Sequence, residues 1–167
     1  MPIALTLLRL LLVVPTLYAL EEDRRGLAFL LVLIAGLTDF FDGRLARKNN
    51  NISKLGALLD PFVDKVFVLS VLSFFLYNQE IGLLPFLLLL FRELTVSFLR
   101  SLAVEKGYLM SASYLGKTKA FFEFLTLMFL CLDSSLSNIL LWISITFAYL
   151  SMYDYLVKYA TFERVKQ

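Results

Sequence analysis

Two pairs of aspartates interrupt apolar segments of this 167-residue chain. Asp39 and Asp42 are spaced i, i+3, and Asp60 and Asp64 are spaced i, i+4, so each pair is expected on one face of a helix. In an apolar membrane segment each charge costs about 2.5–3.5 kcal/mol, and neighbouring carboxylates also repel one another. Cations must offset both costs, and carboxylate oxygens are preferred ligands of Mg²⁺. The four aspartates therefore predict a divalent-metal site.

The surroundings of the aspartates suit phosphoryl transfer. Two ions, Mg²⁺ or Mn²⁺, that lie a few Å apart can clamp a phosphoryl group for in-line displacement. Gly43, Ala46 and Gly56 leave room for a flat group such as a nucleotide. The chain has no histidine, so any general base must be a carboxylate, a lysine, a tyrosine or a cysteine. Interhelical salt bridges or a cation-transport path are the alternative interpretations.

The elements that carry these residues are expected to be membrane helices. Apolar residues make up 59% of the chain, compared with about 45–50% in ordinary globular proteins. A soluble domain of this size cannot bury so much apolar surface. The apolar stretches that approach the length of a spanning helix are 3–20, 27–43, 62–77, 81–99, 119–132 and 136–157. We therefore predict an all-α, single-domain protein over residues 1–167, with six transmembrane helices.

The distribution of lysine and arginine predicts the orientation of these helices. Basic residues gather in the loops after the second and fourth apolar stretches and at the C-terminus, whereas the first loop carries only Arg24 and Arg25, beside acids. The basic loops are expected to be cytoplasmic, because cytoplasmic loops carry an excess of lysine and arginine. With six spans, both termini are cytoplasmic too, and both aspartate pairs lie at cytoplasmic helix ends.

The complete pattern over residues 39–64 resembles the signature of the CDP-alcohol phosphotransferase family. It reads Asp39-x2-Asp42-Gly43-x2-Ala46-Arg47-x8-Gly56-x3-Asp60-x3-Asp64. The resemblance implies a six-helix membrane enzyme, usually homodimeric, that transfers a phosphatidyl or related group from a CDP-linked donor to an alcohol and releases CMP. It implies that Asp39, Asp42 and Asp60 bind metal, and that Asp64 binds metal and acts as the base. The implied CDP-binding residues are Thr6, Asp42, Gly43, Ala46, Arg47 and Gly56.

A second polar set lies in and after the fourth apolar stretch. Arg92 and Glu93 follow a long apolar run, and Arg100, eight residues beyond Arg92, is expected on the same helix face as Arg92. Arginine is well shaped for bidentate phosphate binding. Lys117 and Lys119 open the next helix, whose N-terminus adds positive potential. Arg92, Arg100, Lys117 and Lys119 therefore predict a pocket for the phosphate of an acceptor. The alternative for Arg92 is an ion pair with an intramembrane acid.

This second set is similar to that of the family branch whose acceptor is glycerol 3-phosphate. One difference is Glu123, which stands where a glutamine is common. The resemblance implies phosphatidyl transfer from CDP-diacylglycerol to glycerol 3-phosphate. A bacterial inner membrane fits the small size of the chain, and no charge run suggests nucleic-acid binding. Inositol phosphate, phosphatidylglycerol and serine are alternative acceptors. A divalent-cation transporter is less favoured, because the acids cluster at one membrane face.

Overall fold

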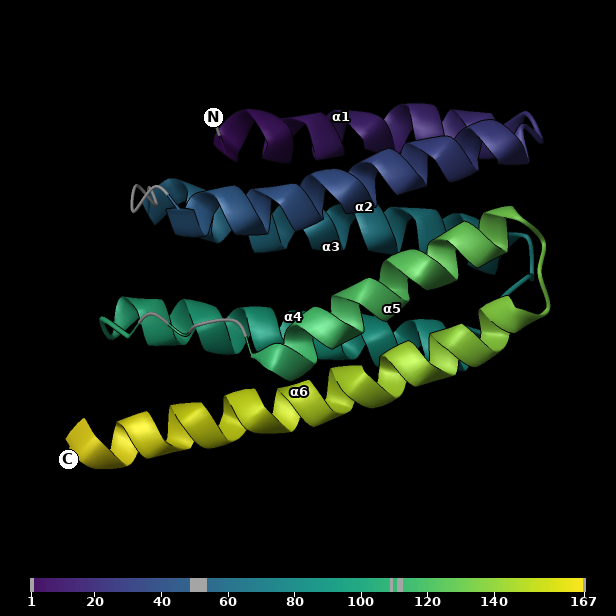
Figure 1. Ribbon diagram of the computed structural model, residues 1–167. Helices are drawn as coiled ribbons and strands as arrows, with labels where there is room; N and C mark the ends of the chain where they lie inside the picture. Colours follow the sequence, from purple (N-terminus) through teal and green to yellow (C-terminus); the bar gives the residue numbers. More distant parts are fainter. Residues whose placement is uncertain (1, 49–53, 109, 111–112, 167) are drawn as a thin grey trace.

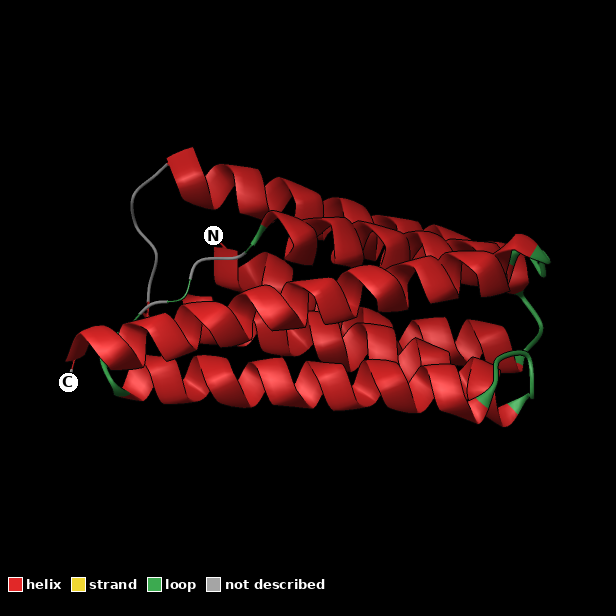
Figure 2. Cartoon of the chain, turned by 90° about the horizontal axis from the view of Figure 1, so that it is seen from below, coloured by secondary structure: helices red, strands yellow, loops and turns green. Residues whose placement is uncertain are grey.

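A computed structural model describes the backbone of residues 2–48, 54–108, 110 and 113–166, and the side chains of 7–38, 62–108, 110 and 113–164. Within these ranges the chain forms helices and no strand (Figures 1 and 2). The six helices of the described residues are α1 (Pro2–Glu21), α2 (Arg25–Lys48), α3 (Lys54–Tyr77), α4 (Leu83–Glu105), α5 (Tyr114–Cys131) and α6 (Leu136–Lys166). The prediction of an all-α fold is confirmed.

Several helices are longer than the apolar stretches that predict them. Helix α5 begins at Tyr114, because the hydroxyl of Ser113 accepts a hydrogen bond from the backbone N–H of Gly116 at 3.0 Å and caps the first turn. Helix α6 continues to Lys166, past the end of its apolar stretch. The added segments contain charged residues, for example Lys117 in α5 and Lys158 in α6.

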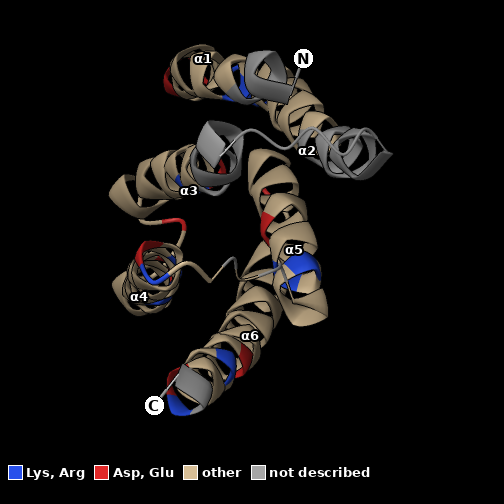
Figure 3. Ribbon diagram, turned by 90° about the vertical axis from the view of Figure 1, so that its left-hand side faces the viewer, with Lys and Arg blue, Asp and Glu red and all other residues tan. Residues whose placement is uncertain are grey.

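The helices run up and down in one bundle. Figure 1 shows α1 beginning, α2 ending, α3 beginning and α6 ending at the same side of the bundle. Helix α5 contacts α2, α3 and α6, while α1 packs against α2 and α3, and α4 packs against α3 and α6. Seen end-on in Figure 3, α5 lies between α2 and α6. Because α5 contacts both α2 and α3, it can set the spacing of the two helices that carry the aspartates.

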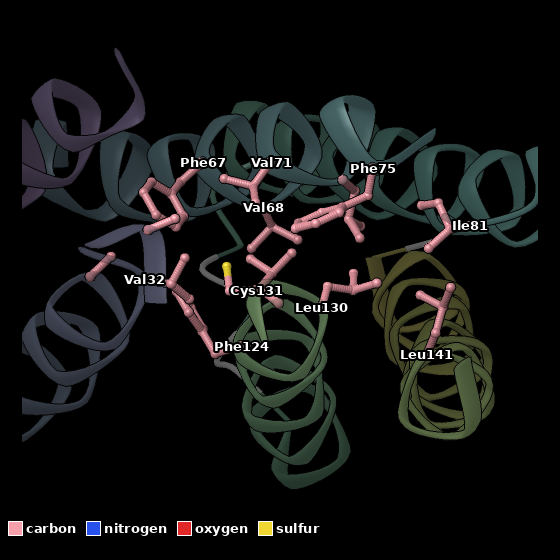
Figure 4. Packing of buried hydrophobic residues seen from close by; sticks show 14 of the residues in the cluster. Val32, Phe67, Val68, Val71, Phe75, Ile81, Phe124, Leu130, Cys131 and Leu141 are labelled. Carbon is pink, nitrogen blue, oxygen red and sulfur yellow. The ribbon is translucent and has the colours of Figure 1, made fainter. Parts of the chain in front are cut away.

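An aromatic layer joins α2, α3 and α5 in the core. Phe67 of α3 stacks on Phe124 of α5 with ring centroids 6.1 Å apart (Figure 4). Gly36 of α2 lies against the same Phe124 ring, so that a Cβ atom built on Gly36 would come within 3.2 Å of Phe124 Cδ1. The missing side chain of Gly36 therefore lets α2 approach α5 closely.

Enlarging Gly36 is expected to disrupt this layer. In Gly36→Leu the new side chain must displace the Phe124 ring, and overpacking of this kind costs about 1–3 kcal/mol. The matched control is Gly26→Leu on the same helix, because a Cβ built on Gly26 meets no atom within 4 Å. Thermal unfolding in detergent is expected to shift to lower temperature for Gly36→Leu and much less for Gly26→Leu. Equal shifts would contradict the packing role of Gly36.

Ion pairs tie the three connections at the opposite side of the bundle. The Arg25 guanidinium donates to Glu80 at 2.8 Å and lies 3.8 Å from Asp133. These residues belong to the α1–α2, α3–α4 and α5–α6 ends, respectively. Because acids surround Arg25, this basic residue adds little net positive charge to its side of the bundle.

Apolar side chains cover the outside of the bundle. Large exposed examples are Leu11 on α1, Phe91 on α4 and Phe121 on α5, with exposed fractions of 71%, 61% and 63%. Among the described residues, Leu136–Arg164 of α6 is long and apolar enough to cross a membrane, and Arg25–Thr38 of α2 is a shorter apolar segment. Buried charged side chains interrupt the apolar sequence of other helices, for example Arg9 in α1 and Arg92 and Glu93 in α4.

Candidate active site

The aromatic layer places both aspartate pairs at one end of the bundle. Asp39 follows Gly36 by three residues in α2, and Asp64 precedes Phe67 by three residues in α3. A helix rises 1.5 Å per residue, so both aspartates are about 4.5 Å beyond the layer along their helices. Asp42 and Asp60 are a further turn out in the same direction. The four helix positions thus lie at two successive levels toward the same end of the bundle.

Most of the predicted metal and nucleotide residues lie outside the described side chains. They are Thr6, Asp39, Asp42, Gly43, Ala46, Arg47, Gly56 and Asp60. The metal site and the nucleotide cleft predicted for these residues remain predictions.

Asp64 is described in full, and its partner is an arginine that the metal-site prediction did not include. Arg9 of α1 donates from Nη1 to Oδ1 of Asp64. The Arg9 side chain is 1% exposed, whereas that of Asp64 is 30% exposed. The opposite charge of Arg9 offsets part of the electrostatic cost of burying this carboxylate. The signal in the sequence was Arg9 itself, a lone charge within an apolar helix.

A second charged cluster surrounds Glu93 of α4. Its Oε1 accepts from Arg92 at 2.5 Å and from the Lys119 ammonium of α5 at 2.7 Å. Its Oε2 lies 3.7 Å from the Lys65 ammonium of α3. The Glu93 side chain is 4% exposed, and its three cationic neighbours explain how a carboxylate is accommodated there. Glu93 therefore links α3, α4 and α5.

Arg92 is directed into the protein, and its contacts match the alternative interpretation of an intramembrane ion pair. Besides Glu93, it donates from Nε to the carbonyl oxygen of Ala148 at 3.0 Å and from Nη2 to the hydroxyl of Ser151. Both of these partners lie on α6. Arg92 thus joins α4 to α6, and every contact that the described residues make with its guanidinium is internal.

Lys119 is enclosed by acids, and Lys117 is not part of the same cluster. The Lys119 ammonium lies 2.6 Å from Oε2 of Glu123, in addition to its contact with Glu93. Glu123, the residue that departs from the family pattern, is thus a buried partner of Lys119. Lys117 is exposed in the first turns of α5, and Arg100 is half-buried on α4. Arg92 and Lys119 thus share Glu93 as a partner, and the phosphate pocket predicted for Arg92, Arg100, Lys117 and Lys119 remains a prediction.

Comparison with known proteins identifies the family of this chain. A family model described as CDP-alcohol phosphatidyltransferase matches residues 1–150. The chain belongs to this family. The phosphatidyltransferase family comprises membrane enzymes, and the chain is accordingly a transferase.

Several bacterial relatives of this phosphatidyltransferase carry one name. A Rickettsia bellii protein is 36% identical over 152 residues, covering 86% of this chain and 84% of the relative. A Rickettsia felis protein is 32% identical over 168 residues, covering 93% and 92%. An Aquifex aeolicus protein is 36% identical over 129 residues, covering 76% and 72%. Each of the three is named CDP-diacylglycerol–glycerol-3-phosphate 3-phosphatidyltransferase.

The donor set of this phosphatidyltransferase fits the divalent metal that the family generally uses. The predicted ligands are all carboxylates, which suit Mg²⁺ or Mn²⁺. Arg9 contacts Oδ1 of Asp64, and no contact among the described residues involves the second carboxylate oxygen. The partly exposed Asp64 side chain is also accessible from outside the core.

Proposed function

We propose that this chain is a CDP-diacylglycerol–glycerol-3-phosphate 3-phosphatidyltransferase, which forms phosphatidylglycerophosphate and CMP. The observation that carries the proposal is the complete aspartate signature in a chain whose relatives, at 32–36% identity over most of their length, bear this name. The position of both aspartate pairs toward one end of the bundle supports a single reaction centre. The buried cluster of cations on α3, α4 and α5 supports a phosphorylated acceptor.

Asp39, Asp42, Asp60 and Asp64 would hold two divalent ions against the diphosphate of the donor. Two such ions would stabilise the negative charge on the phosphate that is transferred. The nucleotide would occupy the cleft predicted for Thr6, Asp42, Gly43, Ala46, Arg47 and Gly56. Glycines and an alanine at these positions permit close approach of the cytidine and diphosphate groups.

Asp64 would act as the general base. Its carboxylate would take the proton from the C1 hydroxyl of glycerol 3-phosphate, and the resulting oxygen would attack the phosphorus that bears the diacylglycerol. The bond between this phosphorus and the oxygen of the CMP phosphate would break, and CMP would leave with the bonding electrons. Arg9 would hold the Asp64 carboxylate ionised and oriented before the proton transfer.

The membrane arrangement that fits this function has six spans, with the reaction centre on the cytoplasmic side of a bacterial inner membrane. Apolar exposed side chains on α1, α4 and α5 support contact of several helices with lipid. Basic residues of α4, α5 and α6 lie toward the end of the bundle that carries the aspartates, as the end-on view in Figure 3 shows. This end would be cytoplasmic. The homodimer implied by the family resemblance remains a prediction.

An acceptor panel tests the proposed function. Purified protein in detergent would receive radiolabelled CDP-diacylglycerol with glycerol 3-phosphate, inositol phosphate, phosphatidylglycerol or serine, in Mg²⁺, Mn²⁺ or excess chelator. We expect turnover with glycerol 3-phosphate in at least one metal, and loss of turnover in chelator. Preference for an unphosphorylated alcohol would overturn the choice of acceptor. Metal flux in proteoliposomes without CDP-dependent chemistry would favour a transporter instead.

A further inference from the structure

The charged cluster around Glu93 holds more positive than negative charge. Lys65, Arg92 and Lys119 contribute three cations, and Glu93 and Glu123 contribute two anions. All five side chains are at most 18% exposed. A buried excess of positive charge is costly and favours an anion as a further partner. The three cations differ in the hydrogen bonds and ion pairs that they already make within the protein.

Arg92 and Lys119 already make close contacts with acidic side chains of the protein. Both of their closest carboxylate contacts are short, at 2.5 Å for Arg92 and 2.6 Å for Lys119, and their side chains are 5% and 8% exposed. Arg92 also donates to Ala148 and Ser151 of α6. A substrate phosphate would have to displace these partners in order to bind either cation.

The Lys65 ammonium can make a further hydrogen bond. Its ammonium donates to the Ser97 hydroxyl and to the carbonyl oxygen of Glu93 at 3.3 Å. Its distance of 3.7 Å from the Glu93 carboxylate is longer than a hydrogen bond. An ammonium has three donors, and the contacts that Lys65 makes with the described residues leave one for another acceptor. The Lys65 side chain is 18% exposed, which is the largest value among the three cations of the cluster.

Arg100 stands on the face of α4 that contacts Lys65. Residues 93, 97 and 100 follow the i, i+4, i+7 spacing of one helix face. Lys65 contacts Glu93 and Ser97 on that face, and Arg100 lies about one turn beyond Ser97 on the same face. Two neighbouring cations repel each other, and a dianionic phosphate between them would relieve the repulsion.

We infer that Lys65 and Arg100 bind the phosphate of the acceptor, and that Ser97 positions Lys65 for this contact. The inference rests on the proposed function and replaces Arg92 and Lys119 with Lys65 in the predicted pocket. Lys65 directly follows Asp64 in α3, but Asp64 contacts α1 and Lys65 contacts α4, so the two side chains diverge around the helix axis. The acceptor would span this divergence, with its hydroxyl at Asp64 and its phosphate at Lys65 and Arg100.

The substitution Lys65→Gln tests this contact. Loss of a charge-assisted hydrogen bond of about 1.5–3 kcal/mol corresponds to a rise of roughly 10- to 100-fold in KM for glycerol 3-phosphate. We expect the KM for CDP-diacylglycerol to stay within about 3-fold of wild type, and inorganic phosphate to inhibit the variant more weakly as a competitor of the acceptor. Lys65→Arg, which keeps the charge, is expected to restore most of the affinity.

Two further measurements separate binding from folding. Lys158→Gln removes the same charge from α6, where Lys158 pairs with Asp154 at 2.9 Å, and it is expected to leave both KM values unchanged. In the folded wild-type protein, saturating glycerol 3-phosphate is expected to protect Lys65 from a small amine-acylating reagent, as read by mass spectrometry. This protection experiment needs no variant and therefore decides the case even if Lys65→Gln does not fold.

The inference and the proposed function fail in different ways. Absence of wild-type turnover with glycerol 3-phosphate would overturn the proposed function. Normal wild-type turnover together with an unchanged acceptor KM in Lys65→Gln would overturn only the role of Lys65. Equal labelling of Lys65 with and without glycerol 3-phosphate would have the same meaning.

Discussion

Replacing Asp64 by asparagine is expected to lower kcat by about 10²- to 10⁴-fold, the usual contribution of a general base. The variant loses the group that would accept the proton of the acceptor hydroxyl, and it would also lose one of the proposed carboxylate ligands of the metal. The amide oxygen of the new side chain can still accept a hydrogen bond from Arg9, so the contact between α1 and α3 is retained in a weaker form. The loss is therefore expected in turnover more than in folding.

The measurement is release of CMP from CDP-diacylglycerol at saturating glycerol 3-phosphate, together with thermal unfolding in detergent. Asp154→Asn provides a matched control, because Asp154 is a partly exposed carboxylate of α6 that pairs with Lys158. We expect the control to turn over at a rate close to that of wild type. Wild-type-like release of CMP by Asp64→Asn would refute the assignment of Asp64 as the base.

Replacing Glu93 by glutamine is expected to destabilise the fold by about 3–5 kcal/mol, the cost of breaking a buried ion pair from one side. The substitution preserves the shape of the side chain but removes its negative charge. Arg92 and Lys119 are 4% and 6% exposed, and they would then share Glu123 as the remaining acid of the cluster. Since Glu93 links α3, α4 and α5, the loss is expected to affect the whole bundle.

Thermal or denaturant unfolding in detergent measures this effect. Glu163→Gln is the matched control, because the Glu163 side chain pairs with Lys106 and is 37% exposed. Pairs exposed to solvent contribute about 0–1 kcal/mol, so the control should change stability little. If Glu93→Gln and Glu163→Gln unfold at the same temperature, the Glu93 cluster does not stabilise the bundle as inferred here.

The existence of the helices could be predicted from local patterns. Long apolar stretches predict helices in a membrane protein because every backbone polar group must find its partner within the segment. The ends of the helices were predicted less well. Tyr114 begins α5 earlier than the apolar stretch does, because the cap from Ser113 depends on a hydroxyl and not on hydropathy.

The partners of the charged residues could not be read from the same patterns. Arg9 and Asp64 are 55 positions apart, and Arg92 and Ser151 are 59 apart, so both pairs depend on how the helices pack. The expected shared face of Arg92 and Arg100 is also refined by the fold. A step of seven residues returns almost to the same helix face, whereas a step of eight overshoots it, and Arg100 therefore shares the face of Glu93.

The sequence by itself determined the chemistry that we propose for this protein. The types and spacing of the four aspartates depend on helical periodicity, which acts over a few residues and is visible without a structure. The tertiary structure alone decided which cation pairs with which anion. It places Arg9 against Asp64, encloses Arg92 and Lys119 around Glu93, and leaves Lys65 with a donor to spare. The physical reason is that a charge in a low-dielectric interior is stable only beside its partner, and helix packing determines which residue that is.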